Sequence, residues 1–276
     1  MEFPYPDVSN DLKIAIDAAL KAGKKVLEIY SQDFTSHYKD DKEPLTEADL
    51  ASDKIIHDVI SLSSYPILSE ESVDNLDRLE SKKIWIVDPL DGTSDFIQKT
   101  GEFTIMIGLV NDQKPIMGVI YWPTKNILYV SEKNKGAYKL ENDIWSQLSV
   151  SDEIEISKSR VVGSRNHLSQ QEKEFLDMLK SKQFTSKGSS LKAMDISSSL
   201  SELYFTTTNK IKQWDTCASW SIVNESGGKM TDMFGTELQY NTEKINHENG
   251  ILVTNGKIHF SIVESYKQFI NTSEIE

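Results

Sequence analysis

Two aspartates three residues apart follow a short apolar run, with a proline between them. The segment is WIVDPLDGT, residues 85–93. A buried strand of this kind delivers its carboxylates to the edge of a sheet, where open α/β folds bind ligands. Hard cations such as Mg²⁺ prefer several oxygen ligands, including carboxylates and loop carbonyls. The carboxylates of Asp88 and Asp91 and the carbonyl oxygen of Leu90 are therefore candidate metal ligands.

The two residues that follow, Gly92 and Thr93, are predicted to begin a short helix. Backbone N–H groups at a helix start can bind a phosphate group. A simpler interpretation is an acidic turn, with Asp91 and Gly92 as its turn residues. Taken alone, the segment leaves both interpretations open. A calcium-binding EF-hand is excluded, because the Asp-x-Asp-x-Asn-Gly run and its distal glutamate are missing.

A second acidic pair, Glu70-Glu71, follows the apolar residues Ile67 and Leu68. In company with the Asp88 loop, Glu70 is favoured as a metal ligand. For Glu71 the favoured interpretation is a solvated strand end. Asp215, in the segment WDTCA, is predicted to lie just ahead of a helix. An N-cap is the commonest role of Asp there, and the same carboxylate can also contact a metal and a substrate.

Thr46 and Asp49 have the spacing of a capping box, with Asp in place of the usual Glu. The alternative is functional: Asp49, one turn into the helix, points into the site and helps to orient a water molecule. Both interpretations are kept.

Other common catalytic motifs are missing. The sequence has no Gly-x-x-x-x-Gly-Lys-Ser/Thr loop, no Gly-x-Ser-x-Gly elbow and no His-Glu-x-x-His pair. Its single cysteine, Cys217, cannot form an internal disulfide or a cysteine zinc site, and we interpret it as a small packing residue. Most of the five histidines are expected to be surface or packing residues.

The net charge of −13 argues against nucleic-acid binding, which needs a basic face to displace counterions. It does not exclude an anionic substrate, since bound cations reverse the local field in a carboxylate-lined pocket. The N-terminal residues are polar, and no run reaches the ~18 apolar residues of a membrane span. We therefore expect a cytoplasmic protein without a transmembrane segment. The sequence does not indicate an oligomeric state.

Apolar periodicity divides the chain of 276 residues into two halves that are expected to pack closely. Residues 153–276 are predicted to form an α/β half that carries Asp215, and residues 1–152 a first half that carries most of the candidate metal ligands. In the first half, helices are predicted at 12–30 and from 46, and strands at 66–68, 84–87, 103–110, 115–122, 127–130 and 136–140. In the second, strands are predicted at 161–162 and 251–254, and helices at 170–179 and 216–225.

Together, the segments LSEE (68–71), DPLDGT (88–93) and WDT (214–216) resemble the motifs of the inositol monophosphatase superfamily, whose members are lithium-sensitive, magnesium-dependent phosphatases. They span most of the chain in the expected order. The resemblance implies a layered αβαβα sandwich, with an α+β half followed by an α/β half.

Within that superfamily the chain looks most like the 3′(2′),5′-bisphosphate nucleotidases, through GEFT (101–104), GSRNH (163–167), GSSLK (188–192) and ELY (202–204). Those enzymes remove the 3′-phosphate of adenosine 3′,5′-bisphosphate, a by-product of sulfate activation and sulfotransfer, and leave AMP. The segment 205–213 departs from the pattern, because TTTNK stands where members often carry Pro-Arg. The resemblance therefore leaves the base-binding side of the pocket open.

The resemblance also implies two to three Mg²⁺ ions. Glu70, Asp88 and the Leu90 carbonyl would hold one, Asp88, Asp91 and Asp215 a second, and Glu70 with waters a third. Two metals ~3.5–4 Å apart can clamp the attacking and leaving oxygens of an in-line displacement. Thr93, paired with Asp49, would orient the attacking water and accept its proton.

A second substrate phosphate needs donors of its own. The residues implied for substrate binding are Glu70, Leu90, Asp91, Gly92, Thr93, Ser164, His167, Gly188, Ser189, Ser190, Lys192 and Asp215. Lys192 is the one cation in the segment GSSLK. For the two serines, a polar helix start is an equally weighted alternative.

Two rival functions stay open. The same site could act on inositol monophosphate or fructose 1,6-bisphosphate, although the GSSLK segment disfavours this. The chain could also be a non-catalytic regulator that binds metal or phosphate and retains the fold.

Overall fold

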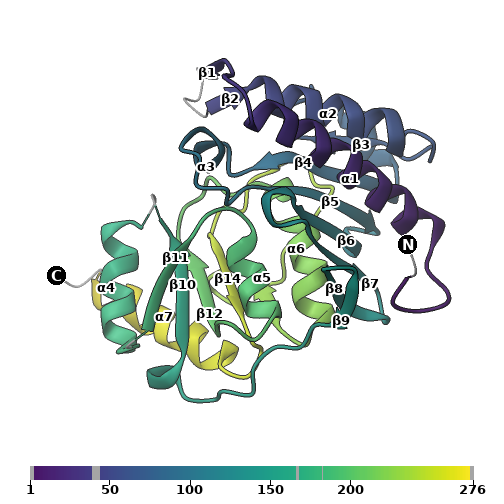
Figure 1. Ribbon diagram of the computed structural model, residues 1–276. Helices are drawn as coiled ribbons and strands as arrows, with labels where there is room; N and C mark the ends of the chain where they lie inside the picture. The colour runs from purple at the N-terminus through teal and green to yellow at the C-terminus, as the bar shows by residue number, and fades with distance from the viewer. Residues whose placement is uncertain (1–2, 39–43, 166–167, 182, 274–276) are drawn as a thin grey trace.

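The computed structural model describes residues 3–38, 44–165, 168–181 and 183–273. Five layers follow one another in the order helix, sheet, helix, sheet, helix (Figure 1). Helices α1 (Asn10–Tyr30) and α2 (Glu47–Ile60) form the first layer, α5 (Leu191–Ser197) and α6 (Gln213–Glu225) the third, and α4 (Gln170–Leu179) and α7 (His259–Ser273) the fifth. This confirms the predicted αβαβα sandwich.

The first sheet has seven strands in chain order, and β3–β4 is its one parallel pair. An antiparallel meander makes up the rest, as the alternating sequence predicts. Its strands are β3 (Ile67–Ser69), β4 (Lys83–Asp91), β5 (Thr104–Asn111), β6 (Lys114–Trp122), β7 (Ile127–Glu132), β8 (Gly136–Glu141) and β9 (Ile144–Gln147).

The second sheet has five strands in the order β11-β10-β12-β14-β13. They are β10 (Arg160–Ser164), β11 (Gln183–Lys187), β12 (Leu203–Thr206), β13 (Lys229–Thr231) and β14 (Ile251–Thr254). A separate hairpin joins β1 (Ser36–Tyr38) to β2 (Pro44–Thr46). The remaining short elements are α3 (Thr93–Ile97), η1 (Leu76–Glu80), η2 (Pro123–Lys125) and η3 (Ile156–Lys158).

Strand β4 sends its side chains alternately to two cores. Trp85 and Val87 pack under α1 and α2, whereas Ile84 and Ile86 pack in the central core with α6. Because the side-chain period of a strand is two residues, Asp88 lies on the face that turns toward α6. The apolar pattern of β4 therefore fixes the side of the sheet on which the acidic site forms.

Helix α6 approaches the seven-stranded sheet very closely because the facing strands carry glycines. A Cβ atom on Gly118 would lie 2.2 Å from the carbonyl oxygen of Ala218, and one on Gly108 would lie 2.4 Å from Cys217 Sγ. Cys217 itself is fully buried, which confirms its interpretation as a packing residue. Any larger side chain at these glycines would push the helix that carries Asp215 away from the sheet.

The sequence predicted some elements well and missed others. Helix 170–179 and strand 251–254 have the predicted bounds. Strand β4 continues through Asp91 instead of ending at Val87, with a register shift between Asp88 and Asp91. The predictions omitted strands β1, β2, β9, β11, β12 and β13 and helix α7. The division at residue 152 falls between β9 and β10 and stays a prediction.

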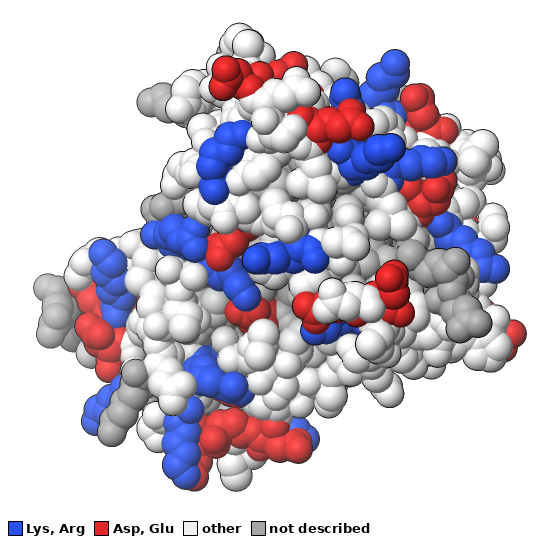
Figure 2. Space-filling view, viewed as in Figure 1, with Lys and Arg blue, Asp and Glu red and all other residues white. Residues whose placement is uncertain are grey.

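The acidic charge does not gather into one field on the face shown in Figure 2, where basic and acidic side chains are interspersed. Among the described residues, no helix combines the length and the apolar character that a membrane crossing requires.

We expect Gly118→Ala to lower the free energy of unfolding by about 1–3 kcal/mol, the usual range for overpacking a core. The added methyl group meets a backbone carbonyl of α6, which cannot rotate away. Urea unfolding monitored by circular dichroism measures the change.

Gly163→Ala is the matched control, because it too is a strand glycine. Its new Cβ would lie 2.7 Å from the ring of Phe184, a partly exposed side chain that can move, and at an ordinary contact distance of 3.7 Å from Leu168 Cδ1. Equal losses in the two variants would contradict the close helix–sheet packing described here.

Candidate metal centre

Three carboxylates from distant parts of the chain converge at one point. Glu70, Asp88 and Asp215 each offer one oxygen atom, and these oxygens all lie within 4.8 Å of one another. Glu70 directly follows β3, Asp88 lies in β4, and Asp215 lies in the first turn of α6. The structure thus brings together three of the residues predicted to bind metal.

Local geometry explains the convergence of the first two. The backbone N–H of Glu70 donates to the Val87 carbonyl at 3.3 Å, which extends the parallel β3–β4 pairing beyond Ser69. Leu68 and Ile86 both face the central core, and Glu70 and Asp88 follow each of them by two residues. Both carboxylates therefore turn toward α6.

Electrostatics within the cluster are unfavourable without a cation. Burial raises the pKa of Asp88 well above its usual value, and the charges of Glu70, Asp91 and Asp215 raise it further. Burial and the charge of Glu70 also raise the pKa of Asp215 well above its usual value. Clustered, desolvated carboxylates are neutralised either by protons or by a metal ion. Because all the donors are oxygens, the set fits a hard divalent cation.

Asp91 lies beside this cluster but is held by other groups. Its Oδ2 accepts from the backbone N–H of Ser190 and, at 3.4 Å, from Thr104 Oγ1. Burial raises the pKa of Asp91, while the positive charge of Lys192 opposes this. Asp91 and the Leu90 carbonyl stay predicted ligands.

Asp215 is not the residue ahead of the helix that the sequence suggested. Helix α6 begins at Gln213, with Lys212 as its N-cap, so Asp215 is the third helical residue. Its Oδ2 still caps the helix, because it accepts from the Lys212 backbone N–H at 2.7 Å. The prediction was wrong in position because nothing in the local sequence marks Lys212 as a cap.

Asp49 forms the predicted capping box and also contacts Thr93, whereas its role in orienting a water molecule stays a prediction. Its Oδ2 accepts from the Thr46 backbone N–H at 2.8 Å and from Thr46 Oγ1 at 2.6 Å, which confirms the capping box. Its Oδ1 accepts from Thr93 Oγ1 at 3.0 Å. Thr93 Oγ1 also lies 3.2 Å from the Leu90 carbonyl oxygen. Burial raises the pKa of Asp49 above its usual value.

The segment 188–190 of the second half packs directly on the segment 91–95 of the first. Gly92 has a φ of +94° and is the N-cap of α3, so that the predicted short helix begins at Thr93; a Cβ atom on Gly92 would lie 3.1 Å from Ser189 Cβ. Ser190 Oγ lies 2.7 Å from Thr104 Oγ1. A Cβ on Gly188 would lie 2.4 Å from Asp95 Oδ2. The predicted second-phosphate segment therefore adjoins the acidic cluster.

Lys192 is a buried cation in this segment. Its side chain is almost fully buried in α5, and Nζ donates to the Ser189 carbonyl at 2.5 Å. Nζ also lies 5.2 Å from the centre of the Tyr204 ring. Burial lowers the pKa of Lys192 below its usual value, although the charge of Asp91 and of other nearby carboxylates opposes this effect.

Of the other two predicted donors, Ser164 ends β10 and pairs with Lys187 of β11, just before Gly188. His167 lies outside the described residues. The histidines that the structure shows to be buried are His247 and His259, which bond to threonines.

Three residues at the rim of this site, Asp95, Glu102 and Arg165, had no predicted role. Arg165 donates to Asp95 Oδ1 at 3.1 Å and to Glu102 Oε2 at 2.7 Å. Glu102 Oε2 also accepts from the Gly188 backbone N–H at 2.8 Å. Glu102 and Arg165 belong to the GEFT and GSRNH segments, which were noted only as resemblances. An ion pair across 63 residues has no local signal.

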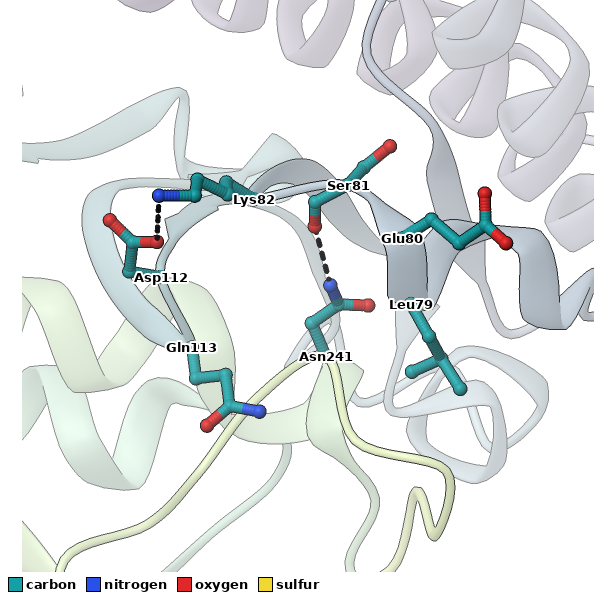
Figure 3. A pocket seen from close by; sticks show the side chains of 7 residues that line it. All are labelled: Leu79, Glu80, Ser81, Lys82, Asp112, Gln113 and Asn241. Atoms are coloured by element: carbon teal, nitrogen blue, oxygen red, sulfur yellow. Dashed lines mark hydrogen bonds and ion pairs between the residues drawn. The ribbon is translucent and has the colours of Figure 1, made fainter.

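A polar pocket lies at the opposite end of β4 (Figure 3). Lys82 and Asp112 form an ion pair of 3.6 Å there, and Asn241 donates to the Ser81 carbonyl at 2.9 Å. None of the residues that line this pocket is among those predicted for the site.

Comparisons with known proteins identify the family of the chain. Residues 7–270 match the inositol monophosphatase family. The chain is 36% identical over 231 residues to the 3′(2′),5′-bisphosphate nucleotidase CysQ of Escherichia coli strain K12, which covers 80% of this chain and 90% of that protein. It is 34% identical over 243 residues to CysQ of Salmonella typhimurium strain LT2, with 86% and 96% covered.

Solved structures show the same fold. CysQ from Bacteroides thetaiotaomicron, a bacterial member of the inositol monophosphatase family, has a TM-score of 0.75 at 32% identity, covering 90% of this chain and 97% of that one. The IMPase of Thermotoga maritima has a TM-score of 0.80 at 23% identity, covering 96% of this chain and 99% of that one. At this identity the likeness shows the fold alone. The chain therefore belongs to the inositol monophosphatase family, a family of metal-dependent phosphomonoesterases.

Proposed function

We propose that this chain is a Mg²⁺-dependent phosphatase that removes the 3′-phosphate of adenosine 3′,5′-bisphosphate and leaves AMP. The observation that carries the proposal is the convergence of Glu70, Asp88 and Asp215 beside a buried lysine. The carboxylates are suited to bind divalent cations, and Lys192 offers a positive charge for a second phosphate. The names of the relatives with 34–36% identity support this choice of substrate.

In this proposal Glu70, Asp88 and Asp215 hold the cations, together with Asp91 and the Leu90 carbonyl. Bound Mg²⁺ would neutralise the phosphoryl oxygens and make a water molecule more acidic. Thr93 orients the attacking water and takes its proton. Asp49, already bonded to Thr93 Oγ1, accepts the proton of that hydroxyl, and its raised pKa suits this role.

The other residues position the substrate. Backbone N–H groups at Gly92 and Thr93 bind the phosphoryl group that departs from the 3′-oxygen. Ser189, Ser190 and Lys192 bind the 5′-phosphate, with Ser164 and His167 beside them. Loose transition states of phosphoryl transfer gain mainly from positioning and charge neutralisation, and this arrangement offers both.

Phosphate release is the decisive test. At equal concentration and with Mg²⁺, adenosine 3′,5′-bisphosphate should give a kcat/KM well above those for inositol 1-phosphate and fructose 1,6-bisphosphate. A preference for either of the latter would replace the proposed substrate and keep the site. Mg²⁺ binding without hydrolysis of any phosphate ester would favour a non-catalytic regulator.

Asp88→Asn should reduce kcat by several orders of magnitude, because it removes the central charge of the cluster and one of the oxygens that face the metal. Asp112→Asn is the matched control: Asp112 is an exposed aspartate on the turn after β5 and should leave kcat unchanged. Near-normal turnover of Asp88→Asn would rule out the metal site described here.

The thermal stability of Asp88→Asn tests the repulsion among the carboxylates of the cluster. Since the folded-state pKa of Asp88 is raised, its carboxyl stabilises the fold below about pH 3.8 and loses this contribution as pH rises through the folded value. Near neutral pH in EDTA, Asp88→Asn should therefore melt at a higher temperature than the wild type, and excess Mg²⁺ should reverse the order. A variant that melts lower in EDTA would contradict the proposed repulsion.

Lys192→Ala should lower kcat/KM for adenosine 3′,5′-bisphosphate more than for 3′-AMP, which lacks the second phosphate. We expect a difference of about 10-fold or more, since a charge-assisted bond contributes about 1.5–3 kcal/mol. Lys173→Ala, an exposed lysine of α4, is the control. Equal losses on the two substrates would show that Lys192 does not bind the 5′-phosphate.

A further inference from the structure

Helix α2 also carries the carboxylate of Asp53, one turn after Asp49 and outside the catalytic scheme above. Asp53 Oδ1 accepts from Ser69 Oγ at 2.5 Å, and Oδ2 accepts from Ser72 Oγ at 3.0 Å. These two serines flank the pair Glu70-Glu71. One carboxylate therefore ties down both ends of the turn that presents Glu70.

The two bonds from Ser69 and Ser72 to Asp53, called the Asp53 clamp below, are supported by a further residue of α2. His57, one turn further along the helix, places Nε2 3.4 Å from Asp53 Oδ1 and 3.4 Å from Ser72 Oγ. Burial alone would raise the pKa of Asp53, but hydrogen bonds from His57, Ser69 and Ser72 outweigh it and leave the pKa lowered. Asp53 is thus a charged acceptor, which strengthens its bonds to both hydroxyls.

Because side chains alternate along a strand, the Asp53 clamp also affects the direction of Glu70. Leu68 packs in the central core on the α6 side of the sheet. Because successive side chains point to opposite faces, Ser69 faces α2, and Glu70 returns to the α6 side, where Asp215 lies. A bond that fixes Ser69 from one side of the sheet therefore fixes the direction of Glu70 on the other side.

The same helix also holds the neighbouring loop. Ser52 Oγ, fully buried, donates to the Pro89 carbonyl at 2.7 Å, and Asp49 holds Thr93. Three segments of the site are thus fastened to successive positions of one helix of 14 residues. The separation of Glu70 and Asp88 then depends on a rigid element instead of on two independent loops.

We propose that Asp53 is a positioning residue, which sets Glu70 in place for metal binding by holding Ser69 and Ser72. The inference rests on the metal-binding role of Glu70 in the proposed function. It assigns Asp53 no contact with the substrate or with the reacting atoms. Partners that orient metal ligands in this way commonly contribute about 10–100-fold to metal affinity or activity.

The test measures Mg²⁺ binding by titration calorimetry without substrate, so that it does not depend on turnover. Asp53→Ala should raise the dissociation constant of Mg²⁺ by about 10-fold or more. Asp53→Asn keeps one acceptor oxygen and should lie between Asp53→Ala and the wild type. Asp58→Asn is the matched control, an exposed aspartate of the same helix whose change should leave the constant unaltered.

A double-mutant cycle separates positioning from a general loss of structure. If Asp53 acts through the serines, adding Asp53→Ala to the pair Ser69→Ala and Ser72→Ala should cause no further loss of Mg²⁺ affinity. Fully additive losses would overturn the proposal, as would wild-type affinity in Asp53→Ala. Circular dichroism and urea midpoints establish that each variant is folded; should Asp53→Ala not fold, Asp53→Asn carries the same comparison.

These outcomes are distinct from failure of the proposed function. A wild type that binds Mg²⁺ but does not hydrolyse adenosine 3′,5′-bisphosphate would remove that substrate and leave the role of Asp53 to the calorimetry. A wild type that binds no Mg²⁺ would overturn both.

Discussion

Mutual repulsion among Glu70, Asp88 and Asp215 is the constraint on which the rest of the site depends. Carboxylates so near one another and partly desolvated are unfavourable unless protons or a cation neutralise them. Packing elsewhere must therefore hold them together against their own charge. The fold does this with two rigid strands on one side and a helix on the other, so that the carboxylates cannot relax by moving apart.

Close packing of α6 is the part of this arrangement that leaves least freedom. Gly108 and Gly118 remove the side chains that would separate the helix from the sheet, and Cys217 and Ala218 fill the contact. Since interiors are packed as densely as organic crystals, the helix has one well-defined distance from the sheet. The position of Asp215, in the first turn of that helix, follows from this distance.

The two faces of the first sheet have different roles. One face carries carboxylates toward α6, and the other face is fastened to α2 through the side chains of Ser52 and Asp53 and through Asp49. Polar groups buried between a helix and a sheet are tolerated when each has a hydrogen-bond partner. Two of those partners, Ser69 and Pro89, lie next to Glu70 and Asp88 of the acidic cluster in the sequence, but their bonds to α2 lie on the opposite side of the sheet.

The sequence by itself determined the features that depend on near neighbours: the capping box of Thr46 and Asp49, the bounds of helix 170–179, and the acidic segments with their family motifs. Tertiary structure decided the rest. It extended β4 through Asp91, placed Asp215 inside α6, and brought Ser190 to Asp91 and Asp53 to Ser69. Caps and periodicity act within a few residues, whereas the contacts of Asp53 with Ser69 and of Asp91 with Ser190 join residues 16 and 99 positions apart, and only the packing of whole layers selects them.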